Sequence, residues 1–213
     1  MPLDCTGEIL PRGISIIQPG DVLNDLDDFC LVLNIEDQVL FYECISEGLK
    51  YWVILEADDY PILVCELEQY ADFLARRGQW QGRRADYLVI GSHGGDCFLI
   101  VVELRHVLVK ADQEEDKFQQ LRETIEHLLR FHLGEIQGSD GLAGVYAAPE
   151  SYRVIGVVIA PGNTRQFSRR ALNPIMNIAD HQVVIRTLPK DALSDCKITW
   201  TGLLEWLGVP RGY

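Results

Sequence analysis

The sequence contains no run of about 18 consecutive apolar residues, so it predicts no membrane-spanning helix. Its first ten residues, MPLDCTGEIL, lack a basic region followed by an apolar one, and we expect no secretory signal there. No internal repeat and no low-complexity linker occurs. The 213 residues are 47% hydrophobic and 24% charged, which is typical of a soluble globular protein. This length predicts one large domain, or one domain with an extension.

Recognisable cysteine patterns are also missing. The six cysteines form no CxxC pair, and no His/Cys cluster has the spacing of a zinc site. Several lie within apolar runs, where cysteine behaves as a small hydrophobe. We therefore expect six free thiols in the reducing environment of the cytoplasm.

Basic residues are scarce in the first part of the chain. Residues 1–60 carry 13 acids and two bases, a net charge of −11, out of −13 for the whole protein. Residues 61–213 carry 19 acids and 17 bases, a net charge of −2. This asymmetry predicts an acidic N-terminal extension, 1–60, packed on a core formed by 61–213.

The core contains local positive patches. One is formed by Arg76, Arg77, Arg83 and Arg84, and a second by Arg165, Arg169 and Arg170. Nucleic acid is the partner that such patches suit, because neutralising phosphates supplies much of the binding free energy. The overall pI of about 4.7 argues against it. Solvated helix ends are the alternative interpretation of these arginines.

Apolar periodicity predicts a mixed α/β fold. Short β-rich runs separated by polar turns predict an antiparallel meander in the extension, with strands at 13–18, 29–35, 38–46 and 50–57. A helix is expected from Pro61 to about Gly78. Two apolar runs flank GSHGGD, which predicts a hairpin, since this turn lacks the GK[ST] ending of a phosphate loop.

The remaining chain continues the pattern. Apolar spacing predicts helices at 113–134, 165–179 and 199–208, and strands at 152–160 and 182–188. We expect a mixed central sheet flanked by helices, with the antiparallel extension beside it.

Two acidic residues occupy informative positions. Asp86 opens the first strand of the hairpin, and Glu103 interrupts its most apolar strand, followed by Arg105. A carboxylate in such a strand is costly unless it is paired or binds a cation. A hairpin can bring Asp86 beside Glu103, and two carboxylates together suit a hard divalent ion such as Mg²⁺ or Mn²⁺.

An acidic helix, a strand that opens with Asp, a strand with Glu-x-basic, a helix and a further strand together resemble the PD-(D/E)xK nuclease superfamily. The resemblance covers about residues 61–188 and implies a restriction-endonuclease-like core. It implies that Asp86 and Glu103 bind a metal, with Glu66 or Glu68 as the acid from the first helix. Arg105 stands where the family has lysine, and Arg83 and Arg84 would contact the nucleic-acid backbone.

Arginine at position 105 departs from the family pattern. A guanidinium group can stabilise charge but stays protonated, so it hardly serves as a base. Some members of the family place the lysine elsewhere, and Lys117 is the candidate, with Lys110 a weaker one. Lys117 lies about 70° from the centre of the apolar stripe of its helix, taking about 100° per residue, and can reach the edge of the sheet. Gln119 and Gln120 are expected to point away from that stripe.

Structural alternatives remain open for these residues. Glu103 and Arg105 could form a structural ion pair, Asp86 could cap a strand, and Lys117 could be a solvated residue at the flank of its helix. The leading hypothesis is a metal-dependent nuclease. There are two alternatives: a catalytically inert binding module with the same fold, and an unrelated α/β domain. We expect a homodimer, and the acidic extension offers a docking surface for a protein partner.

Overall fold

The computed structural model describes residues 5–19, 23, 26–105, 111–131, 152–159, 175–178, 181–188 and 192–209. Predictions that concern Lys110, the second arginine patch and residues 165–174 of the helix expected at 165–179 fall outside these residues. The fold is mixed α/β: the described residues form a seven-stranded sheet, a four-stranded sheet and three α-helices.

The larger sheet is mixed. Its strand order is β2 (Cys30–Leu33), β5 (Ile62–Glu66), β6 (Tyr87–His93), β7 (Asp96–Leu104), β8 (Tyr152–Ile159), β10 (His181–Leu188) and β9 (Ile175–Ile178). Strand β6 runs antiparallel to both β5 and β7, whereas β8 is parallel to β7, and β10 is parallel to β8. The β6–β7 turn consists of Gly94 and Gly95, both with positive φ, as a tight two-residue hairpin requires.

The smaller sheet is built around β4 (Leu49–Glu56). β3 (Gln38–Ser46) pairs with one edge of β4, and β1 (Thr6–Gly7) and β11 (Lys197–Thr199) share the other edge. Strand pairing therefore crosses the predicted boundary at residue 60 twice, because β2 joins the larger sheet and β11 joins the smaller one.

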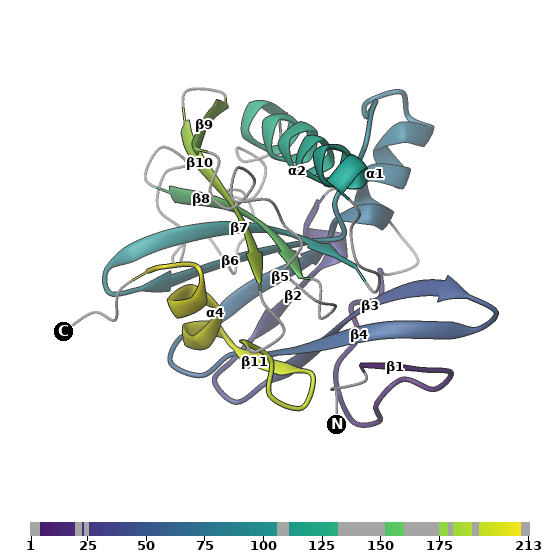
Figure 1. The fold of residues 1–213 in the computed structure, drawn as a ribbon, viewed down its shortest axis with the longest axis vertical. Helices are drawn as coiled ribbons and strands as arrows, with labels where there is room; N and C mark the ends of the chain where they lie inside the picture. Colours follow the sequence, from purple (N-terminus) through teal and green to yellow (C-terminus); the bar gives the residue numbers. More distant parts are fainter. Residues whose placement is uncertain are drawn as a thin grey trace.

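The elements form three layers (Figure 1). Helices α1 (Leu67–Arg76) and α2 (Ala111–Phe131) cover one face of the larger sheet, and their buried apolar residues share a core with that face. The smaller sheet and helix α4 (Trp200–Trp206) cover the other face through a second core. Gly156 in β8 leaves room for α2, since an added Cβ would lie 3.3 Å from Ile125 and 3.5 Å from Leu121.

Three predicted elements are wrong. Residues 62–66 form strand β5 rather than the first turns of a helix, and all five are buried between β2 and β6. Residues 175–178, predicted as the end of a helix, form strand β9 on the edge of the sheet. The strand expected at 13–18 is reduced to a single bridge between Ser15 and Val39. In each case the pairing of distant segments decides the outcome.

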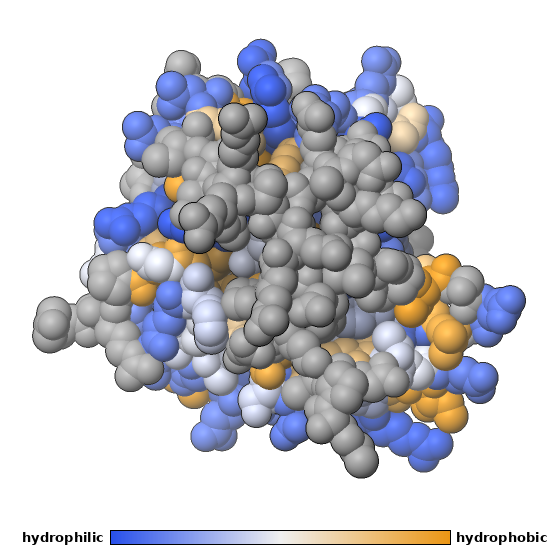
Figure 2. Space-filling model, in the orientation of Figure 1, coloured by the Kyte–Doolittle hydropathy of each residue, from blue (hydrophilic) through white to orange (hydrophobic). Residues whose placement is uncertain are grey.

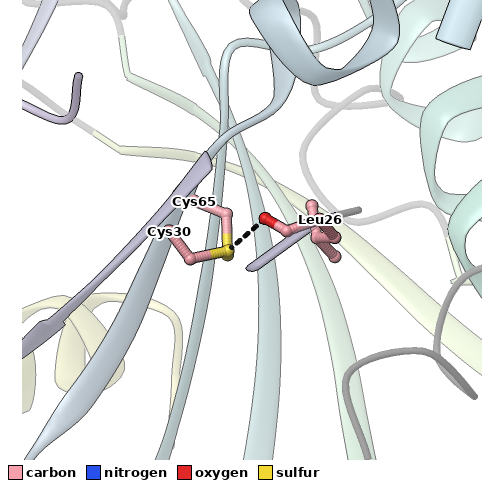
Figure 3. Close-up of a disulfide and its surroundings, with 3 residues drawn as sticks. All are labelled: Leu26, Cys30 and Cys65. Atoms are coloured by element: carbon pink, nitrogen blue, oxygen red, sulfur yellow. Dashed lines mark hydrogen bonds between the residues drawn. A yellow bond between two sulfur atoms is a disulfide. The ribbon is translucent and has the colours of Figure 1, made fainter. Parts of the chain in front are cut away.

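The prediction of six free thiols is also wrong. Cys5 is bonded to Cys196, and Cys30 to Cys65, while Cys44 and Cys97 are free. Cys30 and Cys65 face each other directly in the β2–β5 pair, so sheet register brings them together. The Sγ atom of Cys30 also lies 3.1 Å from the carbonyl oxygen of Leu26 (Figure 3).

Apolar side chains also reach the surface. Hydrophobic residues gather beside the outer end of the β3–β4 hairpin (Figure 2), where Leu49 is 40% exposed. The expected homodimer stays a prediction. Among the described helices, none combines the length and the apolar character that crossing a membrane requires.

Candidate active site

The β6–β7 hairpin places Asp86 opposite Glu103. Tyr87 pairs with Val102, and the N–H of Asp86 donates to the carbonyl of Val102 at 3.0 Å. The carboxylate of Asp86 accepts a bond of 2.6 Å from the N–H of Leu104, which fixes it against the end of β7. The two acids predicted from the sequence therefore lie side by side.

Glu103 is the centre of the site. Its side chain is 3% exposed, and three polar groups surround it. Lys117 Nζ lies 2.7 Å from Oε1, and a guanidinium nitrogen of Arg105 lies 3.3 Å from the same oxygen. The side chain of Gln120 donates to Oε2 at 2.8 Å. Both oxygens of this buried carboxyl group are thus bonded, as burial of a polar group requires.

Helix α2 contributes two of these groups. Its apolar stripe, represented by Leu121, Ile125 and Leu128, is buried against the sheet, and this packing points Lys117 at the end of β7. Lys117 therefore does not extend into solvent: its side chain is only 16% exposed.

The expected orientation of Gln120 is wrong. Its amide bonds Glu103, its carbonyl oxygen accepts from Lys117 at 2.6 Å, and it also donates to the backbone carbonyl of Arg84. Gln119 does point away and bonds Glu123. A helical wheel gives the direction of Gln120 only relative to the centre of the apolar stripe of α2. The end of β7, which Gln120 contacts through Glu103, lies beside that stripe.

Helix α1 and the strand before it add further acids. Glu66 ends β5, is 9% exposed, and has one carboxylate oxygen, Oε2, that is buried without a hydrogen-bond partner among the described residues. Glu68 follows in the first turn of α1 and is exposed. The sequence predicts either Glu66 or Glu68 as the additional metal-binding acid, and Glu66 is the buried one of the two.

The acidic extension supplies an acid that the sequence patterns do not reveal. Glu43 of β3 lies 3.9 Å from a guanidinium nitrogen of Arg105, on the side opposite helix α2. No local pattern identifies Glu43, because only the packing of the smaller sheet on the larger one brings it here.

These residues line one cavity of about 510 Å³. Its wall carries six carboxylates and two cations, which gives −6 + 2 = −4 if every group is ionised. The carboxylates are Glu43, Glu66, Glu68, Asp72, Asp86 and Glu103, and the cations are Arg105 and Lys117. The candidate site is therefore a concave, strongly acidic pocket with two positive charges at the buried Glu103.

Burial and mutual repulsion favour protonated acids in this cavity. Burial raises the pKa of Glu103 to about 8, although Arg105 opposes the shift. Burial and the charges of Glu68 and Asp72 raise the pKa of Glu66 to about 7. Burial and the neighbouring Glu103 raise the pKa of Asp86 well above its usual range. An additional cation would favour the ionised forms of all three.

The chemistry of these donors fits a hard divalent ion. Mg²⁺ and Mn²⁺ prefer carboxylate oxygens, and the buried Oε2 of Glu66 has no other partner among the described residues. Within that part of the chain, no three His, Cys, Asp or Glu side chains converge closely enough to form a ready-made metal centre. Asp86, Glu103 and Glu66 or Glu68 would therefore have to adjust around an ion.

The predicted arginine patch lies beside this cavity. Arg84 pairs at 2.6 Å with Asp72, which lines the cavity. Arg77 stacks over Phe73 at 4.0 Å, at the end of α1. Arg76 and Arg83 are exposed. Arg84 thus joins the patch to the rim of the cavity.

Comparison with known proteins gives no family for the chain: no family model, no curated protein and no solved structure matches it significantly. A function for this protein therefore has to be inferred from the geometry of the site.

Proposed function

We propose that the protein is a divalent-metal-dependent nuclease that acts on the phosphodiester bonds of nucleic acid. One observation carries the proposal: Asp86 and Glu103 stand together at the end of a buried hairpin, with Lys117 Nζ 2.7 Å from Glu103. The order α1, Asp86 directly before β6, β7 with Glu103, α2 and β8 supports a PD-(D/E)xK-like, restriction-endonuclease-like core.

In this proposal Asp86 and Glu103 bind Mg²⁺ or Mn²⁺, with Glu66 or Glu68 as a further ligand. Such an ion activates water and stabilises negative charge on the phosphate. The protein contributes a set of carboxyl oxygens that would adjust around the ion, and the ion would favour their ionised forms.

Lys117 takes the place that lysine has in the family pattern. Its ammonium group reaches the same carboxylate as Arg105 but from helix α2. Lys117 orients the attacking water and stabilises developing charge, while Arg105, which stays protonated, stabilises charge only. The arginines Arg76, Arg77, Arg83 and Arg84 hold the nucleic-acid backbone outside the cavity.

The first test is a calorimetric titration with Mn²⁺. We expect the wild type to bind the ion and the double variant Asp86→Asn/Glu103→Gln to lose binding while keeping its fold. Asp96→Asn is the matched control, because Asp96 lies at the opposite end of the same hairpin and pairs with Arg153. Cleavage of labelled DNA and RNA should disappear in the double variant and persist in the control. Unchanged cleavage in the double variant would show that Asp86 and Glu103 are not the metal ligands of the nuclease.

A catalytically inert binding or assembly module is the second candidate. The observation that favours it is the saturation of Glu103, whose two oxygens are already bonded by Lys117 and Gln120. In that case the positive groups stabilise the fold, and the acidic extension is available to a partner. A wild type that binds no Mn²⁺ and cuts no nucleic acid selects this candidate.

A further inference from the structure

The cavity lining combines charged and apolar residues. Five of its six acids and both cations lie at residue 66 or later, whereas the first 60 residues contribute Ile16, Ile17, Leu40 and Tyr42, which we call the apolar wall, and one acid, Glu43. Ile17 and Leu40 are buried, and Tyr42 is half-buried. A ligand in this cavity therefore meets apolar and aromatic surface as well as charge.

The apolar wall is held in place by the larger sheet. The hydroxyl group of Tyr87 accepts a bond of 3.0 Å from the N–H of Tyr42 and donates to its carbonyl at 3.3 Å. The rings of Tyr87 and Phe41 stack with their centroids 4.3 Å apart. The segment that carries Ile16 is fixed to β3 through Ser15, which exchanges backbone bonds with Gln38 and Leu40.

Tyr42 also faces the acids. Burial raises the pKa of its hydroxyl group, and the nearby Cys44, Glu66 and Glu68 add to the increase. Tyr42, Ile16 and Ile17 line the same cavity as Asp86 and Glu103, so a flat group that stacks on the Tyr42 ring shares the cavity with these two acids.

These features define a substrate, provided that the protein is the nuclease proposed above. We infer that the cavity takes one unpaired nucleotide of a single strand, with its base against Tyr42 and Ile16 and its phosphate at the Asp86–Glu103 end. A volume of about 510 Å³ suits a small-molecule ligand, and enzymes that take one nucleotide out of a helix use enclosed pockets for it. Stacking on an aromatic ring binds every type of base, so the site needs no sequence preference.

The charge of the rim opposes a duplex. Glu43, Glu68 and Asp72 lie at partly exposed positions around the cavity, and a duplex would bring two phosphate backbones toward them. A single strand brings one backbone, which the arginines beside Arg84 can hold.

The test compares one labelled oligonucleotide in two forms, single-stranded and annealed into a blunt duplex, with Mg²⁺ and with Mn²⁺. We expect the single strand to be cut at least about tenfold faster. The variant Tyr42→Ala should raise KM for the single strand about tenfold, whereas Tyr42→Phe, which keeps the ring, should resemble the wild type. Equal cutting of the two forms, or an unchanged KM in Tyr42→Ala, would overturn the inference.

A binding measurement separates this inference from the proposed function. An oligonucleotide that carries 2-aminopurine is titrated with protein in Ca²⁺, and stacking on Tyr42 should quench its fluorescence in the wild type but not in Tyr42→Ala. Metal-dependent cutting without quenching, or with a duplex preference, refutes the inference and leaves the nuclease proposal intact. Absence of both Mn²⁺ binding and cutting refutes both.

Discussion

Lys117 and Glu103 form a buried hydrogen-bonded pair between helix α2 and strand β7, with Lys117 Nζ 2.7 Å from Glu103 Oε1. Gln120, one turn further along α2, bonds both residues. The pair lies beside Asp86 in an acidic cavity, so it connects the charge of the helix to the acids of the hairpin. This relationship makes Lys117 the first residue to test.

Replacing Lys117 with methionine should lower kcat by about 10²–10³, because a preorganised positive group at a developing charge contributes about that much. The stem of methionine preserves the packing of α2, and circular dichroism checks the fold. Lys50→Met is the control, since Lys50 lies on β4 and outside this cavity. A variant with wild-type kcat would mean that the pair is structural.

Without metal, the protein should become less stable as pH rises from about 4.5 to about 8. The folded state keeps a proton on Glu103 up to a pKa of about 8, whereas the unfolded chain loses it near the ordinary value of 4.5. The folded state therefore binds more protons in this window, and stability decreases with pH. Urea unfolding at pH 5, 6.5 and 8 measures the slope. Glu103→Gln should reduce the slope but not abolish it, because Glu66 and Asp86 also have raised pKa values. Glu126→Gln, on the exposed side of α2, should leave the slope unchanged.

Binding of Mn²⁺ should release protons. Carboxylates bind metal in their ionised form. Because pH 6 is below the pKa values of Glu66, about 7, and Glu103, about 8, both side chains carry a proton before the ion binds. Affinity should therefore rise by about tenfold per pH unit for each proton displaced. Calorimetry in two buffers of different ionisation enthalpy counts these protons. Binding that is independent of pH would place the ion elsewhere.

Loss of the Cys30–Cys65 bond should lower the free energy of unfolding by about 3–4 kcal/mol, because it closes a loop of 35 residues. Urea unfolding of Cys30→Ser/Cys65→Ser measures the loss. The control is Cys44→Ser/Cys97→Ser, which removes the two free thiols. Peptide mapping without reductant should recover both cross-linked pairs, and free thiols at all six positions would contradict the structure.

The arginine patch should set the salt dependence of nucleic-acid binding. Arg76→Ala/Arg77→Ala should weaken binding equally for all sequences and reduce the slope of log affinity against log salt by about 1 for each phosphate that the variant no longer neutralises. Arg130→Ala is the matched control, because Arg130 lies on α2 and pairs with Glu126. An unchanged slope would show that these arginines are solvated helix ends.

Local patterns are sufficient to predict the parts of the fold that local interactions determine. The β6–β7 hairpin follows from two apolar runs around adjacent glycines, and α2 follows from apolar spacing. The hairpin also predicts the proximity of Asp86 and Glu103, because its register is set by a two-residue turn.

The remainder depends on contacts between distant segments. Leu67, Tyr70, Ala71 and Leu74 do form the buried face of α1, but the apolar residues before them belong to β5, and only pairing with β2 and β6 distinguishes the two. Contacts between distant segments also bring Glu43 into the site and pair the cysteines. The direction of Gln120 could not be predicted because a helical wheel does not contain the position of β7.

The position of β11 in the smaller sheet determines when that sheet can be completed during synthesis. It joins the sheet of β1, β3 and β4, and Cys196, just before it, is bonded to Cys5, 191 residues earlier. A ribosome delivers the chain from its N-terminus, so the first 60 residues emerge long before the strand that completes their sheet. The edge of β4 and the thiol of Cys5 must wait until residues 196–199 have been synthesised. Completion of this sheet and formation of the Cys5–Cys196 bond are therefore late events relative to the synthesis of the first 60 residues.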